Sequence, residues 1–568
     1  MKKIRNKLDF KHRADLCYNF LTRMTDEKLD LLPYWLIAID EEPAWARHYR
    51  VDDSELPGSW AEALIRLRQM TGDDQGLRTE RAFKKLALRD FAENGLRFHH
   101  KYPWTRTIFC NYHEMAYFAS LFAAWYEDEP DNKEMIEKAR GLVRGLLKVV
   151  AEKKEITYWS GNFPQQRKSY TFEGDSYYEG KGYDKTRWTG RGEESIRNAI
   201  MISGLVRWAE LTKDEAAMDL AEGLINHVVY ESRKFGYEQQ YIAHVHSTMW
   251  ITTGVIHYGI LTNNTELIKW GRGVYEYTKK HSSTFGWVPE YIGWRDPREE
   301  FCETCCIKDM IECALCLIRA GYAGYWEDID RFSRNHLCES QFDQADAIAV
   351  DNSKPDTAEY TWKDIGERAV GGFSGGTEVN SLSISRFRSL AGCCMGTAPQ
   401  AFYFVWLNSV TEENDGIHVN LPNDRETDSV NVFSHHPEEA KLDIQMKKDA
   451  KALFVRISPW AGGRVHVRVV GKDIFPIWIG DEIVIREPRK GMKITVQHAN
   501  PAVRRKEDIR GTTYDVDWVG NTVYNVYPKG DPIRLYQRGP RPPKGDGLKI
   551  PAPTQWSSLT NLQIDSPE

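Results

Sequence analysis

The sequence predicts a mainly α-helical N-terminal part followed by an all-β C-terminal part. From about residue 10 to 405, apolar residues recur with the 3.6-residue period of amphipathic helices. After about residue 415 the period changes to two, which is typical of strands. The chain has 568 residues, of which 41% are hydrophobic, so it can bury a large core. We therefore expect two domains, a helical one over 1–410 and a β-sandwich with an extended tail over 411–568.

The helical patterns come in pairs that are joined by short polar turns, such as Thr212-Lys213-Asp214. Repeated helical hairpins stack into a solenoid or close into an α/α toroid, and we favour the toroid. The expected pairs are Glu114–Tyr126 with Lys133–Lys153, Glu193–Leu211 with Glu215–Tyr230, His246–Leu261 with Thr265–Lys280, and Thr304–Ala323 with Tyr325–Leu337.

Alternating apolar and polar residues predict an antiparallel β-sandwich in the C-terminal part. Turn signals such as Ala461-Gly462-Gly463 separate the strands, and the Pro- and Gly-rich tail after Arg538 is expected to be extended or loosely ordered. The expected strands are Lys441–Met446, Leu453–Ile457, Arg464–Val470, Glu482–Ile485 and Met492–Gln497.

Two long segments of the helical part, Trp159–Arg191 and Gln341–Ser385, have few apolar aliphatic residues or many glycines, and we expect them to be loops. Loops of this length in a compact domain usually serve a functional site. A structural cap is the other interpretation.

The net charge of -6 argues against a nucleic-acid partner held by bulk charge. No apolar run approaches 18 residues, so no membrane span is predicted. The basic start of the chain is not followed by the apolar run of a signal peptide. We therefore expect a cytoplasmic enzyme, while a removed leader and a homodimer stay open.

The positions of the ten cysteines are the most informative part of the composition. Six of them lie between positions 302 and 338, and two are adjacent at Cys393 and Cys394. A disulfide scaffold would spread its cysteines over a small secreted fold. The clustering favours metal binding or thiol chemistry in a reducing compartment.

Glu303, Cys305, Cys393 and Cys394 form a ligand set that suits Zn²⁺, which prefers four ligands from thiolate, imidazole and carboxylate. Glu303 and Cys305 can reach one ion only if the backbone enters the following helix in a non-helical conformation. Cys393 and Cys394 can both reach it only where the backbone is irregular, as the preceding glycine allows. Cys313-x-x-Cys316 lies in an apolar helical run and is interpreted as core packing.

A zinc-bound thiol is deprotonated at neutral pH, and a thiolate can attack the anomeric carbon of a sugar. A carboxylic acid must then protonate the leaving oxygen, as in a retaining glycosidase. Glu290 lies among apolar neighbours in Trp287-Val288-Pro289-Glu290-Tyr291, surroundings that keep a carboxyl group protonated. A surface Glu in a loop is the alternative interpretation.

The pattern Glu290 … Glu303-Thr304-Cys305 … Cys393-Cys394 resembles the β-L-arabinofuranosidases of glycoside hydrolase family 127 and their uncharacterised relatives. The resemblance covers most of residues 100–540 and includes Asp415-Gly416-Ile417-His418. It implies an (α/α)6 barrel followed by β-sandwich domains.

The resemblance also implies roles for single residues. Cys393 would be the nucleophile and Glu290 the general acid/base. His246 matches a histidine near the sugar. The metal ligands would be Glu303, Cys305, Cys393 and Cys394, with Zn²⁺ as the cofactor.

The sequence departs from the family pattern beside these motifs. Met395-Gly396-Thr397 stands where the family usually has Pro-Pro-Asn, Pro289 stands in place of the glycine before the acid, and Cys306 adds a neighbouring thiol. Because of these departures, the resemblance predicts the metal site more firmly than it predicts the substrate.

A sugar site should also hold aromatic rings, because the C–H face of a sugar packs on aromatic surface. The candidates for substrate contact are His246, Trp250 and Trp294, with Trp188 and Trp104 as further rings.

The leading functional hypothesis is a zinc-dependent, retaining exo-glycosidase, β-L-arabinofuranosidase-like, acting on a small sugar or oligosaccharide. One alternative is a sugar lyase or hydratase on the same α/α barrel. The other is a non-catalytic carbohydrate-binding protein with a structural zinc. The fold does not choose among them, since function is determined by the site.

Overall fold

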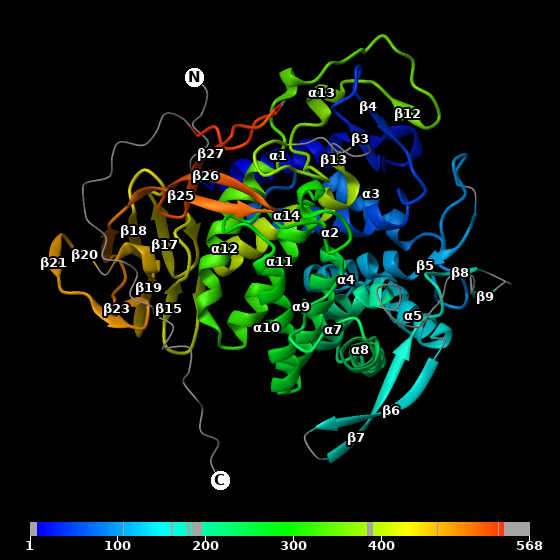
Figure 1. Cartoon of the computed structure of the whole chain (residues 1–568), viewed down its shortest axis with the longest axis horizontal. Coiled ribbons are helices and arrows are strands. Elements are labelled where there is room, and N and C mark those ends of the chain that lie inside the picture. The colour runs from blue at the N-terminus through cyan, green and yellow to red at the C-terminus, as the bar shows by residue number, and fades with distance from the viewer. Residues whose placement is uncertain are drawn as a thin grey trace.

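The computed structural model has two lobes, a large helical lobe and a smaller β-sandwich beside it (Figure 1). It describes residues 8–105, 107–150, 152–160, 163–178, 182–183, 196–382, 390–462, 464–531 and 533–538. Within those ranges, every helix is too short or too polar to cross a membrane. The tail after Arg538 lies outside the described residues. Trp188, one of the expected sugar platforms, also lies outside them.

Six helices of the large lobe form a closed inner ring, because each contacts the next and the last contacts the first. A second set of six helices packs against the ring from outside. The predicted α/α toroid is thereby confirmed. The inner helices are α2 (Glu55–Thr71), α4 (Tyr112–Asp128), α7 (Ile202–Thr212), α9 (Val245–Leu261), α11 (Thr304–Arg319) and α14 (Gly392–Asn408), and the outer ones are α1 (Phe10–Arg23), α3 (Leu77–Leu88), α5 (Lys133–Val149), α8 (Glu215–Asn226), α10 (Thr265–Lys280) and α12 (Trp326–Phe332).

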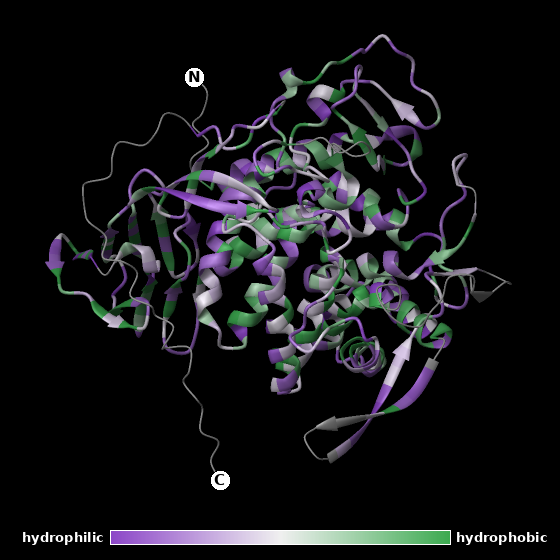
Figure 2. Ribbon diagram, in the orientation of Figure 1, coloured by the Kyte–Doolittle hydropathy of each residue, from purple (hydrophilic) through white to green (hydrophobic). Residues whose placement is uncertain are grey.

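Sequence composition explains which helices are inside. The inner helix α9 is apolar on nearly all sides and buries 14 of its 17 residues, whereas its outer partner α10 buries 5 of 16 along one stripe. Polar N-caps start the outer helices: Asn132 accepts from the backbone of α5, and Asn264 accepts from that of α10. Figure 2 shows hydrophobic residues concentrated in the helical centre and hydrophilic residues on the periphery.

Glycines allow the inner helices to pack closely. A Cβ at Gly204 of α7 would lie 2.6 Å from the backbone of Ser120 in α4, and one at Gly254 of α9 would lie 2.6 Å from the backbone of Ser203. Both approaches are too short for any larger residue, so these glycines set the spacing of the ring.

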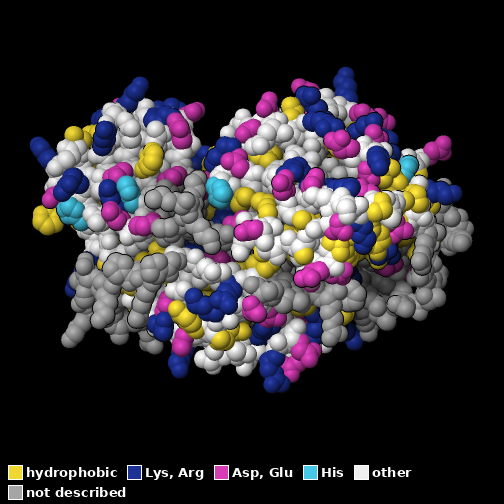
Figure 3. All heavy atoms as spheres, turned by 90° about the horizontal axis from the view of Figure 1, so that it is seen from above, with side chains coloured by type: hydrophobic (Ala, Val, Ile, Leu, Met, Phe, Trp, Pro, Cys, Tyr) yellow, Lys and Arg dark blue, Asp and Glu magenta, His cyan; other side chains and the backbone are white. Residues whose placement is uncertain are grey.

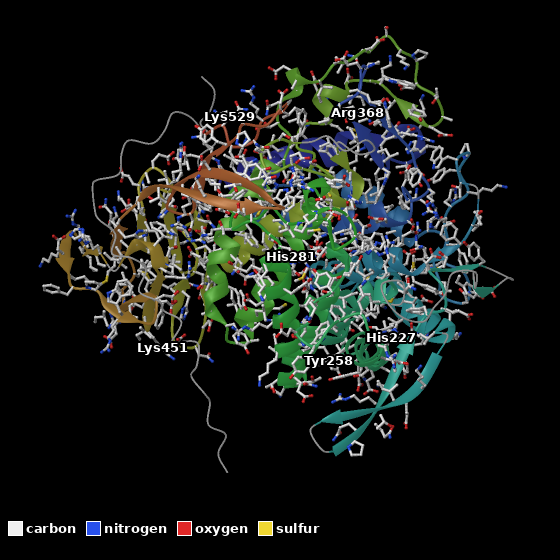
Figure 4. All side chains as sticks on the ribbon, viewed as in Figure 1. His227, Tyr258, His281, Arg368, Lys451 and Lys529 are labelled. Carbon is white, nitrogen blue, oxygen red and sulfur yellow. The ribbon has the colours of Figure 1, made fainter. Side chains whose placement is uncertain are left out.

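One expected loop is partly a β-hairpin. Strands β6 (Glu152–Ser160) and β7 (Phe163–Thr171) pair antiparallel and project from the lower right of the lobe in Figure 1. The helix expected over Lys133–Lys153 therefore ends at Val149. The expectation of a loop from Trp159 is wrong because the exposed hairpin shows no alternating apolar pattern. His227 and Tyr258 lie on the side of the helical lobe that carries this hairpin (Figure 4).

The expected sandwich is present as two sheets around a shared apolar cluster. The strand expected over Lys441–Met446 coincides with β18, and the others agree to within a residue or two. One sheet has the order β14 (Val410–Glu412), β15 (Ile417–Val419), β19 (Ala452–Arg456), β23 (Glu482–Arg486), β22 (Ile477–Ile479); the other has β16 (Arg425–Glu426), β17 (Val430–Ser434), β18 (Lys441–Met446), β24 (Lys493–His498), β20 (Val465–Val469), β21 (Lys472–Ile474). All neighbouring strands pair antiparallel except β15 and β19.

A third sheet, β25 (Ala502–Ile509), β26 (Thr512–Val519) and β27 (Thr522–Tyr527), follows the sandwich in sequence but packs on the helices. Trp518 and Tyr536 belong to the apolar cluster of the helical lobe, and the Tyr536 hydroxyl lies 2.7 Å from Nδ1 of His336. The chain thus returns to the helical lobe after the sandwich. The division of the chain at residue 410 stays a prediction.

Two short pairings lead into the inner helices. Strand β13 (Leu390–Ala391) pairs with β3 (Leu36–Ala38) directly before α14. Strand β10 (Ala243–His244) pairs with β11 (Tyr291–Ile292) directly before α9. Both pairings fix the direction in which the first turn of an inner helix enters the ring.

Candidate active site and metal centre

Several inner helices begin at one end of the ring, and the candidate site residues lie there. Hydrogen bonds join residues in or just before the first two turns of α4, α9, α11 and α14. The N-terminus of a helix carries partial positive charge and stabilises anions. This end of the ring is therefore suited to carboxylates and thiolates.

Glu303, Cys305, Cys393 and Cys394 form one buried cluster, in which one ligand atom of each lies within 4.8 Å of the others. The Cys305 and Cys394 sulfurs are 3.4 Å apart, and the Cys393 sulfur is 3.6 Å from Oε1 of Glu303. The structure thus brings together all four ligands that the sequence predicts, although α11 and α14 are separated by 72 residues in the chain.

The donor set fits zinc. Four ligands about 2.3 Å from a common tetrahedral centre lie about 3.8 Å from one another. The spacings of 3.4 and 3.6 Å are close to this value. If all three thiols and the carboxylate were ionised, up to four negative charges would lie in a buried space, and a bound cation would have to neutralise them.

The pKa values of the thiols indicate how many of them the protein ionises by itself. Burial raises the pKa of Cys305 well above its usual value, and hydrogen bonds with Cys393 and Cys394 raise it further. For Cys393, a hydrogen bond with Cys305 lowers the pKa, but the bond with Cys394 and burial outweigh it. For Cys394, burial is outweighed by hydrogen bonds from the other two thiols, which lower its pKa to about 6. The protein alone therefore favours one thiolate rather than three.

The backbone conformation agrees with the expectation at Glu303 but not at Cys393 and Cys394. Glu303 is the N-cap of α11 and has an extended conformation, so the predicted non-helical entry is confirmed. The expected irregular backbone at Cys393 and Cys394 is wrong, because α14 begins at Gly392 and both cysteines lie in its first turn. Neighbouring side chains of a helix diverge by about 100°, and Cys393 contacts Glu303 whereas Cys394 contacts Cys305.

Cys302, Cys306, Cys313 and Cys316, the other cysteines near Cys305 in sequence, lie outside the four-ligand cluster. All ten cysteines are free and buried. Cys313 and Cys316 pack in α11 as core residues, as expected. The Cys306 sulfur is 3.9 Å from Oε2 of Glu303, and Cys302 bridges to Pro289 and Thr377 in the backbone. Cys306 is thus a neighbour of one ligand.

Glu290 lies next to the metal cluster. The pairing of β10 with β11 places it beside His244, and carboxylate or ring atoms of His244, Glu290 and Glu303 lie within 4.8 Å of one another. His244 Nε2 is 2.9 Å from Oε2 of Glu303, and Arg295 donates to Oε2 of Glu290 at 3.4 Å. Glu290 is half-buried, so a molecule in the site can reach it.

His246 lies in a chain of buried polar groups. Its Nδ1 is 2.5 Å from Oδ2 of Asp309, and its Nε2 is 3.2 Å from the Tyr117 hydroxyl. Burial opposes the charged form, but Asp309 outweighs it and raises the pKa of His246 to about 9. His246 is therefore a cation at neutral pH. Tyr117 belongs to no sequence motif that would have indicated it, whereas Asp309 lies four residues after Cys305 on the same helix face, a spacing that could have indicated it.

The three candidate tryptophans have different positions. Trp250 is buried, stacks on His246 at 5.5 Å and carries Lys308 over its ring, so it supports the histidine from behind. Trp294 is 58% exposed and stacks on Tyr291, next to Glu290. Trp104 is stacked against His48 and Tyr102. Trp294 thus has the exposure that a sugar platform needs.

Two further polar side chains lie around the site. Glu55, at the start of α2, is buried, and burial together with the charge of Cys393 raises its pKa well above the usual value. His113, in the first turn of α4, has a pKa lowered well below the usual value by burial and by Arg197. Neither residue could be predicted from the sequence, because neither belongs to a motif with a recognisable spacing.

No protein-family model and no curated protein sequence matches the chain. Solved structures do match its fold. A family 127 β-L-arabinofuranosidase from Geobacillus stearothermophilus T6 superposes with a TM-score of 0.56 at 12% identity, over 90% of this chain and 80% of that one.

Two further structures agree with it. A family 127 β-arabinofuranosidase gives a TM-score of 0.59 at 14% identity, over 90% of this chain and 79% of that one. A protein described as a glycoside hydrolase gives 0.54 at 12% identity, over 88% and 85%. The resemblance inferred from the cysteine motifs is thereby confirmed for the fold: this chain has the architecture of the family 127 glycoside hydrolases, an α/α barrel with β-sandwich domains.

Proposed function

We propose that this protein is a zinc-dependent, retaining exo-glycosidase of the β-L-arabinofuranosidase type. One observation supports this most strongly: a buried cluster of one carboxylate and three thiols lies beside a second carboxylate, Glu290, at the end of the ring where inner helices begin. The likeness in fold to family 127 enzymes supports the same class of substrate.

Cys393 is the proposed nucleophile. The residue is 6% exposed, whereas Cys305 and Cys394 are fully buried, which makes Cys393 the most accessible cysteine of the cluster. It also lies in the first turn of α14, where the helix favours a thiolate.

Glu290 is the proposed general acid/base. In the first step the Cys393 sulfur bonds to the anomeric carbon, the bond from that carbon to the leaving oxygen breaks, and Glu290 gives its proton to that oxygen. In the second step Glu290 takes a proton from water, the water oxygen bonds to the anomeric carbon, and the carbon–sulfur bond breaks to restore the thiolate. Two displacements retain the configuration of the sugar.

Glu303, Cys305, Cys393 and Cys394 would hold the zinc. Bound zinc would keep the thiols ionised at neutral pH. His244 orients Glu303 through the 2.9 Å contact, and Arg295 donates to the Glu290 carboxylate at 3.4 Å. His246 and Trp294 are the proposed contacts to sugar hydroxyls and to the sugar face, with Trp250 behind His246.

Activity of three variants on a panel of aryl glycosides that includes an aryl β-L-arabinofuranoside tests this proposal. Cys393→Ser and Glu290→Gln should each lower kcat/KM by about 10²–10⁴-fold. Cys316→Ala, a buried cysteine of α11 outside the cluster, is the matched control and should keep most activity. Full activity in either of the first two variants would contradict the role assigned to that residue.

The products separate this proposal from its alternatives. A retaining hydrolase releases a reducing sugar whose first-formed anomer matches the substrate. A lyase would release an unsaturated product that absorbs ultraviolet light. A carbohydrate-binding protein with a structural zinc would bind a glycan without turnover and would lose stability when zinc is removed.

A further inference from the structure

The third sheet contacts the segment that carries Glu290. Its strands β25 and β26 are joined by a two-residue turn, Arg510-Gly511, in which φ is 48° and 78°. Positive φ at both central positions is the geometry of tight hairpin turns, so Arg510 lies at a well-defined hairpin tip. Figure 1 shows this sheet, in orange, lying across the helical lobe beside the sandwich. Near the tip, a Cβ at Gly511 would lie 3.7 Å from Cγ of Arg298, in the loop that follows Glu290.

Arg510 connects two segments of the helical lobe that are far apart in sequence. It donates to the carbonyl oxygen of Glu300 and to the carboxylate of Glu378. Its guanidinium carbon also lies 5.7 Å from the centre of the Trp287 ring. Hydrogen bonds from a charged donor are roughly twice as strong as those between neutral groups. Arg510 therefore holds the backbone of the loop at Glu300 in place.

Arg510 and Glu300 are more buried than charged side chains usually are. Lysine, arginine, aspartate and glutamate side chains are spread over the surface of the protein, as Figure 3 shows for one face. The Arg510 side chain, by contrast, is 11% exposed, and that of Glu300 is 4% exposed. Burial raises the pKa of Glu300 above its usual value, although the nearby charges of Arg295 and Arg510 lower it. Burying charged groups costs free energy unless they are paired, so this arrangement indicates a role for their contacts.

Glu300 connects Arg510 to the surroundings of Glu290. Its Oε2 accepts from the backbone N–H of Tyr291, the residue after Glu290, at 3.3 Å. The same oxygen lies 3.9 Å from Nη1 of Arg295, and Arg295 donates to Oε2 of Glu290 at 3.4 Å. The Arg295 guanidinium carbon also lies 5.1 Å from the centre of the Tyr291 ring. A chain of contacts thus runs from the hairpin tip through Glu300 and Arg295 to the Glu290 carboxyl group.

The main chain of Glu290 is held on both sides. Its N–H donates to the Phe301 carbonyl oxygen at 2.8 Å, and its own carbonyl oxygen accepts from the Val245 N–H at 2.8 Å. These bonds fix where the side chain starts, whereas the direction of the carboxyl group depends on contacts such as the one with Arg295. An acid must lie within hydrogen-bond reach of the oxygen that it protonates, and a displacement of about 1 Å can lower the rate about 100-fold.

We propose that Arg510 is a positioning residue for glycoside cleavage. Through Glu300 and Arg295 it holds the Glu290 carboxyl group where that group can give its proton to the leaving oxygen. The inference rests on the proposed function. It makes the third sheet, which follows the sandwich in sequence, part of the structure that determines the rate at the metal end of the ring.

The dependence of the rate on the leaving group tests the proposal. The substrates are two aryl glycosides of a sugar that the wild type hydrolyses, one with 2,4-dinitrophenol and one with phenol as the leaving group. Dinitrophenolate needs little help from an acid, whereas phenol leaves only when its oxygen is protonated. The ratio of the two kcat/KM values therefore reports how well Glu290 is placed. Arg510→Gln should lower kcat/KM about 10- to 100-fold for the phenyl glycoside and less than about threefold for the dinitrophenyl glycoside.

Arg504→Gln is the matched control. Arg504 lies on β25 and pairs with Asp517 of β26 at 2.7 Å, so the substitution removes an arginine–carboxylate pair within the same sheet. It should leave the ratio at the wild-type value. A merely structural role of Arg510 would lower both kcat/KM values by the same factor, because a smaller folded fraction affects both substrates equally.

Glu300→Gln supplies a second variant of the same chain of contacts. It removes the charge beside Arg295 but keeps an acceptor for the Tyr291 N–H, and it should change the ratio in the same direction. The double variant R510Q/E300Q should change the ratio no further than the larger single effect, because both substitutions interrupt one chain of contacts. Single effects that multiply in the double variant would show that the two residues act independently, and would overturn the proposal.

Hydrogen exchange of the Tyr291 amide separates a failure of this inference from a failure of the proposed function. The amide should exchange several-fold faster in Arg510→Gln than in the wild type, and at the wild-type rate in Arg504→Gln. If the wild type hydrolyses both glycosides and Arg510→Gln keeps its ratio, the inference is overturned and the proposed function stands. If the wild type hydrolyses neither, the proposed function is overturned, and the role of Arg510 in the reaction with it. The exchange rate then decides whether Arg510 holds the Glu290 segment, and an unchanged rate overturns that as well.

Discussion

Thr397 and Cys305 join two inner helices at the metal cluster. The Thr397 hydroxyl donates to the Cys305 sulfur at 3.1 Å and lies 3.2 Å from the Cys393 carbonyl oxygen. Thr397 belongs to the segment in which this chain departs from the family motif. The departure therefore places a hydroxyl donor, at the start of α14, against a thiol that would ligate zinc.

Thr397→Val should weaken metal binding, because it keeps the side-chain shape but removes the donor to Cys305. Partners of metal ligands usually contribute 10- to 100-fold to affinity. We expect the zinc dissociation constant to rise by about that factor, measured by competition with a chromophoric chelator. Thr253→Val in α9, whose hydroxyl bonds within its own helix to the Met249 carbonyl, is the control and should leave it unchanged.

Glu303→Gln should remove the metal from the isolated protein. The substitution takes away the only carboxylate of the four-residue cluster and leaves the His244 ring beside a neutral amide. Elemental analysis should give about one zinc per chain for the wild type and much less for the variant. Glu299→Gln, on the exposed turn Pro297–Glu299, should keep its zinc. Equal zinc content in Glu303→Gln would remove Glu303 from the ligand set.

Asp309→Asn should destabilise the protein more at pH 6 than at pH 9.5. Burial lowers the pKa of His246, but Asp309 outweighs it and raises the pKa from 6.5 to about 9. A pKa raised in the folded state contributes stability that is complete below about pH 6.5 and is lost as the pH rises through about 9. Urea unfolding of wild type and variant at the two pH values measures the difference.

Glu312→Gln is the matched control for that experiment. It breaks the 2.5 Å contact with Lys308 on the same helix. Burial opposes the charge of Lys308, but Glu312 and Asp309 outweigh it and raise its pKa above the usual value, so Lys308 stays charged at both pH values. Its loss of stability should therefore be alike at pH 6 and 9.5. A deficit of Asp309→Asn that does not change with pH would contradict the assignment of His246 as a cation.

Gly396→Ala should destabilise the fold by about 1–3 kcal/mol, because a small residue is required where α14 crosses α2. A Cβ at Gly396 would lie 2.2 Å from Oγ of Ser59 and 2.3 Å from its Cβ. Ser59→Gly in the same chain should recover much of the loss. Thermal unfolding of the two variants measures both effects, and a stable single variant would show that the helices can separate.

The regular parts of the fold could be predicted because their apolar periodicity extends over many residues. Strand Lys441–Met446 and helix Thr265–Lys280 were predicted within a residue, since each buries one face against a core. Hairpin β6–β7 was not predicted, because its exposed strands carry lysine and glutamine where a half-buried strand would carry apolar residues. An apolar periodicity arises because one face of an element is buried, so it does not predict strands that are exposed on both faces.

The candidate site could be predicted only where its residues are close in sequence or part of a motif. Glu303 and Cys305 are neighbours, and the adjacent Cys393 and Cys394 are conspicuous in any chain. Glu55 lies more than three hundred residues from Cys393, and the ring alone brings α2 beside α14. The expected irregular backbone at Cys393 was wrong because the start of a helix already lets successive side chains diverge.

The central claim, that the Cys393 sulfur becomes bonded to the sugar, can be tested by trapping the intermediate. Glu290→Gln, which should be slow to activate water, would be mixed with an aryl β-L-arabinofuranoside bearing a good leaving group, quenched in acid and digested for mass spectrometry. We expect the peptide that contains Cys393 to gain one anhydropentose, and Cys393→Ser to show no such gain. A modified residue other than Cys393, or turnover of the wild type with inversion at the anomeric carbon, would contradict the account.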